Sequence, residues 1–339
     1  MKQLSNHLKL ITIKTFLSAF VFTLLPVSAE EVNVYSHRHY ESDDKLFKEF
    51  TKNTGIKVNI VKASADALIE RIKAEGKQSP ADILITADAG RLVRAQDAGL
   101  LQTASSPSLN KQVPKHMRDK DGHWYGFTVR SRVLIYSKER INPSRLSTYE
   151  DLADPKWKGK LCLRTSKKVY NRSLIASMID AYGYDKTKKV VSGWVSNLAT
   201  EVFSNDTNAL KAVSSGQCGV TIVNTYYLAR LLDDPSYSNL KIFWANQHDR
   251  GVHVNISGAG VVKSSKNKIN AVKLLEYLSS VDAQNFYASA NKEYPVVENV
   301  VIDESIKDWG AFIEDDINVA KLGELQKEAV FLAQEVGYK

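Results

Sequence analysis

The sequence predicts an α/β protein of two lobes joined by two β-strand crossings, arranged as a hinged clamshell. Strand and helix patterns alternate along the chain from residue 32, which favours a largely parallel sheet in each lobe. Two long β-rich runs, at 123–138 and 251–265, interrupt this alternation where a helix would be due. We interpret these runs as the strands that pass between the lobes.

The first lobe begins with three pairs of a short apolar strand and an amphipathic helix. The helix patterns each end at a glycine, which can adopt the left-handed conformation of a helix stop. We expect Ser42 to cap the first helix, with Asp43 and Asp44 in its first turn, where the helix dipole favours acids. The predicted strands and their helices are 32–36 and 42–55, 56–61 and 64–76, and 81–86 and 89–99.

The second lobe repeats this arrangement after the first β-rich run. It is predicted to have strands at 159–164 and 219–224, helices at 171–183 and 187–199, and, after the second β-rich run, further helical segments at 270–290 and 317–337. We divide the chain into a leader (1–29), the first lobe (30–128 and 257–305), the second lobe (129–256) and C-terminal helices packed on the second lobe (306–339).

The first 29 residues have the three-part layout of a cleaved export signal. Three lysines accompany the apolar run TFLSAFVFTLLP, which is too short to span a bilayer, and Val27 and Ala29 put small residues at the cleavage positions. The mature chain is therefore expected to begin near Glu30. Without the leader's lysines the formal net charge of +8 becomes +5, and the remaining basic residues form no arginine-rich stripe, which argues against nucleic-acid binding.

Cys162 and Cys218 are the two cysteines of the chain, and export would bring them into an oxidising compartment. We therefore predict a disulfide between them. A thiol redox centre is the alternative, but the sequence has no CxxC pattern to support it.

Tyrosines stand at strand-to-helix junctions in both lobes. Tyr40 follows the first strand, and Tyr226 and Tyr227 follow the strand at 219–224. Adjacent residues can face one ligand only at a helix start or turn, which is where this pair lies. Free N–H groups at a helix start also favour negative charge on nearby oxygens. Packing is the usual role of an aromatic pair, so it is the match between the lobes that favours binding.

Converging phenol oxygens suit a hard trivalent cation. A free tyrosine has a pKa of about 10 and stays neutral near pH 7, whereas a bound metal of high charge stabilises the phenolate. We therefore predict that Fe(III) binds in the cleft between the lobes. A second hypothesis keeps the clamshell and places a polyamine, thiamine or an oxyanion there. A third, a secreted hydrolase, finds no GxSxG or HExxH pattern in the sequence.

Five segments resemble the periplasmic ferric-iron-binding proteins of ABC transporters, in particular the tyrosine-rich, anion-independent subgroup with cyanobacterial members: SHRHYESD, ADILITADAGRL, WYGFTVRSRVLIYSK, CLRTSKKVYNRSLIASMI and VNTYYLARLL. The resemblance implies a periplasmic-binding-protein clamshell. It also implies a monomer without enzymatic activity that delivers iron in the periplasm to an inner-membrane permease and its ATPase. By motif, the implied ligands are four tyrosinates and a histidine that can approach the metal: Tyr40, Tyr170, Tyr226, Tyr227 and His39.

Other residues of these segments are considered as neighbours of the metal. A second subgroup of the family uses a glutamate as a ligand, and the corresponding position of this chain falls near Asp88. The side chain of aspartate is one methylene shorter than that of glutamate. We therefore keep Asp88 as a hydrogen-bond acceptor or an alternative ligand. Arg230 stands four residues after Tyr226 on the same predicted helix, so it can balance the net charge of four phenolates and Fe(III). Further cationic candidates are Arg38, Arg130 and Arg132. A solvated loop position stays open as the alternative for His39.

Overall fold

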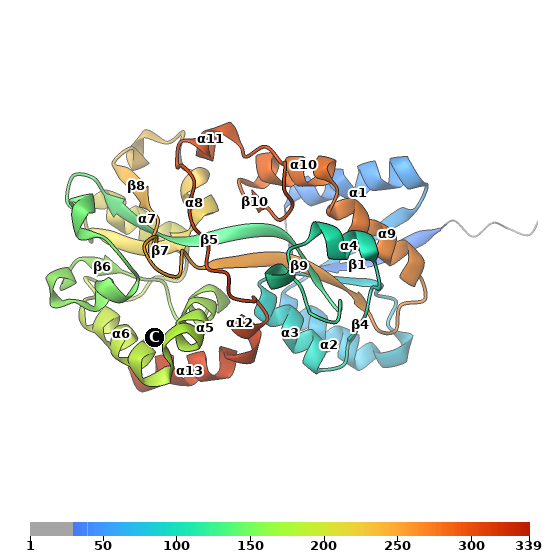
Figure 1. Ribbon diagram of the computed structural model, residues 1–339, viewed down its shortest axis with the longest axis horizontal. Coiled ribbons are helices and arrows are strands. Elements are labelled where there is room, and N and C mark those ends of the chain that lie inside the picture. Colours follow the sequence, from blue (N-terminus) through green and yellow to red (C-terminus); the bar gives the residue numbers. More distant parts are fainter. Residues whose placement is uncertain (1–29, 39) are drawn as a thin grey trace, which may run out of the picture.

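The computed structural model describes residues 30–38 and 40–339, and the predicted leader therefore lies outside the described residues. Two α/β lobes lie side by side along the long axis of the molecule, with strands running through the middle from one lobe into the other (Figure 1). Within the described part of the chain these strands form one sheet of order β2-β1-β3-β9-β5-β7-β6, to which β4, β8 and β10 add at β9 and β5.

The N-lobe contains the parallel strands β2-β1-β3, as the alternating pattern predicts. Gly55 ends the first helix in the left-handed conformation, with a φ of 75°. The predicted cap at Ser42 is wrong, because the helix already begins at Glu41 and Ser42 donates a hydrogen bond to the side chain of Asn291 instead. The N-lobe elements are β1 (Glu31–Ser36), α1 (Glu41–Thr54), β2 (Lys57–Lys62), α2 (Ala65–Glu75), β3 (Ile83–Ala87), α3 (Ala89–Asp97), β4 (Leu101–Gln102), α4 (Pro107–Gln112), α9 (Lys268–Leu278), α10 (Val281–Asn291) and β10 (Tyr294–Pro295).

The C-lobe repeats the layout with shorter strands. The two cysteines form the predicted disulfide, which links β6 to the end of the loop before β7. The C-lobe elements are β6 (Leu161–Cys162), α5 (Val169–Tyr182), α6 (Tyr184–Ser196), α7 (Asp206–Ser215), β7 (Val220–Asn224), α8 (Thr225–Ala229), β8 (Leu240–Phe243) and α13 (Gln326–Glu335).

The two β-rich runs form the long strands β5 (Tyr125–Ser137) and β9 (Val254–Val262), which cross between the lobes as predicted. The first half of β5 pairs antiparallel with β9, and the second half pairs with β7 and β8. The change of partner falls between Ser131, opposite Val254, and Arg132, opposite Asn224. A rotation of one lobe against the other therefore has to bend these strands near that point.

The chain after β10 makes a third, irregular passage between the lobes. After α11 (Glu304–Lys307), Phe312 stacks on Trp244, which follows β8 of the C-lobe, with ring centroids 4.1 Å apart. The amide of Val319 then donates to the carbonyl of His116 in the N-lobe. The short helix α12 (Lys321–Glu324) packs against both α3 and α5, and α13 packs against α5 and α6. The C-terminal helices thus contact both lobes.

Membrane insertion has no helical candidate in the described ranges, since none of their helices combines the length and the apolar character that a bilayer crossing requires.

Candidate metal centre

Tyr40 lies between β1 and α1, half-buried, in extended backbone at the residue before the helix. The guanidinium of Arg38 stacks over its ring, 4.7 Å from the centroid. Arg38 is itself buried and fixed from three sides, by ion pairs to Asp43 at 2.9 Å and Glu293 at 3.2 Å and by a hydrogen bond to Thr128. A buried cation held in this way keeps the ring of Tyr40 in place, because cation–π attraction strengthens when water is excluded.

Tyr226 and Tyr227 are the second and third residues of α8, which follows β7 directly, and their ring centroids are 4.5 Å apart at an angle of 33°. Asn224, the last residue of β7, donates from its side-chain amide to the hydroxyl of Tyr226 at 3.2 Å. Its amide oxygen accepts from Arg132 at 3.0 Å. Asn224 therefore serves to orient one of the candidate ligands.

Tyr170 is the second residue of α5, so our placement of this tyrosine before the helix is wrong. Its ring lies beneath two guanidinium groups, with Arg164 at 5.3 Å and Arg130 at 5.9 Å from the centroid. The next residue, Asn171, accepts from Arg132 at 2.9 Å. Arg132 thus reaches the start of α5 through Asn171.

Arg132 connects the starts of the two C-lobe helices that carry the tyrosines, α5 and α8. Together with Arg164 it pairs with the buried carboxylate of Asp206, at 3.1 and 2.9 Å respectively. Because Arg132 contacts both Asn171 and Asn224, one side chain ties the start of α5 to the start of α8. We expected Arg132 only as one more cation, and the sequence holds no signal for its pairing with Asp206, 74 residues away.

The phenol of Tyr226 lies close enough to the other three tyrosines to feel their charge. Burial raises the pKa of Tyr226 well above its ordinary value, and the nearby phenols of Tyr170, Tyr227 and Tyr40 raise it further. Burial also raises the pKa of Tyr227. Without a cation the phenols of Tyr226 and Tyr227 are therefore neutral, and a cation that binds to them has to displace their protons.

Positive charge surrounds the tyrosine cluster. Arg230 follows the last residue of α8 and lies 5.1 Å from the ring centroid of Tyr40 and 5.0 Å from that of Tyr226, so it spans the two lobes. Arg130 is buried, donates to Ser257 at 2.7 Å, and its Nε has no hydrogen-bond partner among the described residues. Burial and Glu293 raise the pKa of Tyr40, and the neighbouring guanidinium groups lower it.

Asp88 is a hydrogen-bond acceptor, one of the two roles that we considered for it. Its carboxylate is fully buried and accepts from Ser173, Asn255 and the amide of Gly90, at 2.8, 2.8 and 2.9 Å. Burial raises the pKa of Asp88, while Arg91 and these hydrogen bonds oppose that rise. Both carboxylate oxygens of Asp88 are therefore engaged in hydrogen bonds within the protein.

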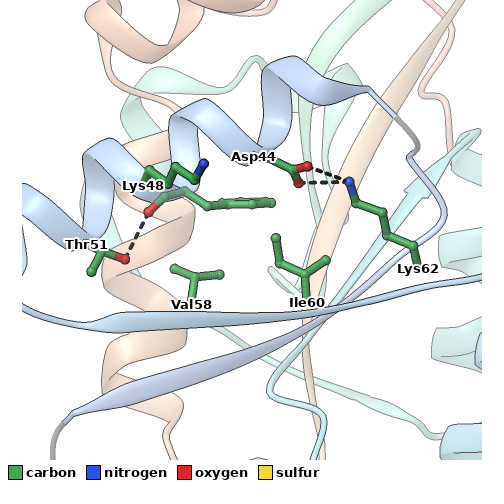
Figure 2. Close-up of a pocket in the computed structure, with 7 residues that line it drawn as sticks. Asp44, Lys48, Thr51, Val58, Ile60 and Lys62 are labelled. Carbon is green, nitrogen blue, oxygen red and sulfur yellow. Dashed lines mark hydrogen bonds and ion pairs between the residues drawn. The ribbon is translucent and has the colours of Figure 1, made fainter.

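Two further features of the described chain lie apart from the tyrosines. Asp119, Asp121 and His123 have potential ligand atoms within 4.8 Å of one another, but Asp119 already accepts from the amide and the ring of His123. Figure 2 shows a groove of about 590 Å³ between α1 and β2, into which Val58 and Ile60 point. None of the four tyrosines lines this groove. His39 lies outside the described residues.

Known proteins are similar to this chain over most of its length. A family model described as bacterial extracellular solute-binding protein matches residues 78–314, more than half of the chain. Iron uptake protein A1 of Synechocystis sp. (strain ATCC 27184 / PCC 6803 / Kazusa) is 46% identical over 320 residues, which cover 93% of this chain and 89% of that protein.

Solved structures give the same result. A Trichodesmium protein, described in complex with iron and citrate ligands, is 47% identical with a TM-score of 0.89, over 91% of this chain and 100% of that one. The ferric binding protein from Campylobacter jejuni is 39% identical with a TM-score of 0.85, over 91% and 100% of the two chains. The present chain therefore belongs to the bacterial extracellular solute-binding proteins.

Proposed function

We propose that this protein captures ferric iron in the cleft between its lobes and delivers it to an ABC permease. The observation that carries the proposal is the convergence of four tyrosines from both lobes within a ring of guanidinium groups: Tyr40, Tyr170, Tyr226 and Tyr227. Neutral phenols surrounded by cations offer little to a cationic organic ligand, whereas phenolate oxygens are the hard anionic donors that Fe(III) prefers. The printed names of the relatives, iron uptake and ferric-binding proteins, support the same ligand.

The charges of the site support this choice of metal. Four phenolates and one Fe(III) sum to a net charge of minus one, and Arg230 contacts tyrosine rings of both lobes. Arg130, whose buried charge has Ser257 as its partner, adds positive charge beside Tyr170. A closed site of low net charge can exclude water without a large desolvation cost. The four phenols act as ligands in this proposal, and His39 is a candidate for a fifth.

Binding and release follow from the two-lobed construction. We infer that the two lobes move against each other by bending β5 and β9 where β5 changes partner, between Ser131 and Arg132, so that Asn255 and Ile256 of β9 move with the N-lobe. Closure brings Tyr40 to the three C-lobe tyrosines, and opening at the permease withdraws it. The predicted leader would export the chain to the periplasm, where a monomer would deliver iron to an inner-membrane permease driven by its ATPase. Solute binding rather than catalysis is the activity of the family.

Titration of the mature protein with Fe(III), supplied as a weak chelate, tests the proposal. Phenolate bound to Fe(III) gives an intense visible charge-transfer band, so the protein should become coloured and saturate at one iron per chain. A polyamine, thiamine and phosphate should leave the spectrum unchanged and should not displace the iron. A protein that stays colourless at saturating iron would contradict the proposal.

A further inference from the structure

Asp88 has an unusual backbone conformation for a residue with a side chain. It joins β3 to α3 with a φ of 123° and a ψ of 126°, outside the regions that L-residues normally occupy. Such a conformation persists only where the surroundings determine it from several directions, and it frequently accompanies a functional constraint. The contacts of Asp88 show which elements impose it.

On the N-lobe side, Asp88 is attached to the crossing strand β9. Its amide donates to the carbonyl of Ile256 at 2.9 Å, and its carboxylate accepts from Asn255 at 2.8 Å. The amide of the next residue, Ala89, donates back to Asn255 at 3.1 Å. Asp88, the start of α3 and β9 therefore form one unit, and these bonds do not have to break when the lobes separate.

On the C-lobe side, Asp88 accepts one hydrogen bond, from the hydroxyl of Ser173 at 2.8 Å. Ser173 lies on α5, three residues after Tyr170, so the two side chains share a face of the helix. The start of α5 is also fixed within the C-lobe, through Asn171 and Arg132. Movement of the C-lobe away from β9 therefore carries Tyr170 along and has to break the bond between Ser173 and Asp88.

We propose that Asp88 is a positioning residue that latches the two lobes in the closed state and, by holding α5 through Ser173, sets Tyr170 opposite Tyr40. This inference rests on the proposed function, because it assigns to Asp88 the control of closure around the same metal. The bond is strong for a single contact, since its acceptor is an ionisable carboxylate removed from water. In this proposal Asp88 acts on the closure of the lobes and does not itself contact the iron.

Ser173→Ala tests the latch, because it removes the hydroxyl and leaves the attachment of Asp88 to β9 in place. Ser177→Ala is the matched control: Ser177 is equally buried on the same helix, one turn later, and its hydroxyl donates to the carbonyl of Leu174 and accepts from Arg250 at 3.3 Å, so both of these partners belong to the C-lobe. Ser173→Cys is a second test variant, since a thiol keeps the volume but donates only weakly. Thermal unfolding of each variant would confirm that it is folded.

Two measurements follow. Small-angle scattering of the iron-free proteins should give a larger radius of gyration for Ser173→Ala and Ser173→Cys than for the wild type and Ser177→Ala. Release of iron to an excess of a strong chelator, followed by loss of the visible band, should be about tenfold faster for the two Ser173 variants, as expected for one hydrogen bond to a carboxylate. The position of the band should not change, because all four phenolates remain.

The inference would be overturned if the Ser173 variants matched the wild type in both radius and release rate, or if Ser177→Ala changed them equally. A shifted band in the Ser173 variants would also overturn it, because the residue would then act on the ligands and not on closure. The scattering comparison needs no iron. A wild-type protein that stays colourless would therefore refute the proposed function, while the radii would still decide whether Ser173 and Asp88 latch the lobes.

Discussion

The two lobes support their tyrosines in different ways. In the N-lobe, Arg38 stacks directly on Tyr40 and shares two carboxylates, Asp43 and Glu293. In the C-lobe the ratio of carboxylates to guanidinium groups is reversed, since the single carboxylate of Asp206 pairs with both Arg132 and Arg164. In the N-lobe, one tyrosine thus stacks on a guanidinium group that has two carboxylate partners. In the C-lobe, three tyrosines are supported by two guanidinium groups that share one carboxylate.

The difference indicates that the C-lobe is a preassembled half of the site. Arg132 reaches the start of α5 and the start of α8 through two asparagines, so three of the candidate ligands are held in one rigid arrangement. In the proposed function, the N-lobe then completes the site when the lobes close. The following experiments would break or sharpen this comparison.

Asp206→Asn should have the largest effect. Removing this buried carboxylate leaves two buried guanidinium groups without their counter-ion, which should lower the free energy of unfolding by about 3–5 kcal/mol. Asp43→Asn is the matched change in the N-lobe, and it should cost less because Arg38 keeps Glu293. Urea unfolding of both variants measures the difference. Equal losses would contradict the idea that the C-lobe depends on one anion.

Removal of single phenol oxygens should separate the two halves of the site. Tyr226→Phe should weaken Fe(III) binding by more than about 100-fold, because even residues that only orient ligands change metal affinity 10–100-fold. Tyr40→Phe should leave a coloured protein that no longer becomes more compact when iron is added. Competition with a chelator and small-angle scattering would measure these results. If Tyr226→Phe kept the wild-type affinity and colour, its assignment as a ligand would be wrong.

Iron affinity should fall as the pH is lowered from 8 to 6. The pKa values of Tyr226 and Tyr227 are raised, so both phenols carry protons throughout this window, and iron has to displace them. Each displaced proton should reduce the apparent affinity by about tenfold per pH unit, after correction for the chelator's own protonation. Tyr226→Phe should reduce this slope by one proton. An affinity independent of pH would mean that the phenols do not ionise on binding.

His39→Ala should have the smallest effect on affinity, less than about threefold, because a borderline nitrogen donor adds little beside four anionic oxygens. The shape of the charge-transfer band is the more sensitive measurement, since loss of a fifth ligand would alter it. A large loss of affinity would instead mean that the N-lobe contributes two essential donors, Tyr40 and His39. The contrast between the lobes would then be smaller than we infer.

Local patterns predicted much of this architecture. The alternation of strands and helices, the two crossing strands and the helix stop at Gly55 all depend on interactions within a few residues, and the structure has them where expected. The same local reasoning placed the starts of α1 and α5 too late: α1 begins at Glu41, with Ser42 bonded to Asn291 of α10, and α5 begins at Val169. Helix ends are the least locally determined part of a helix.

The candidate ligands divide in the same way. Tyr226 and Tyr227 could be selected from their position at a helix start, whereas Tyr170 came only from the resemblance to known proteins. Neither route could find Glu293, which pairs with a residue 255 positions earlier in the chain. Its burial follows from folding, and nothing in the neighbouring sequence distinguishes it from a surface glutamate.

The sequence by itself therefore determined the two-lobed α/β plan and the disulfide between its two cysteines, and it singled out phenols as the candidate donors, because periodicity and residue chemistry are local properties. Only the tertiary structure decided which buried charges pair, that Arg132 supports two tyrosine-bearing helices, and that Asp88 joins β9 to α5. The physical reason is that a buried polar group must find its partner wherever the fold brings one, and that distance in space bears no fixed relation to distance along the chain.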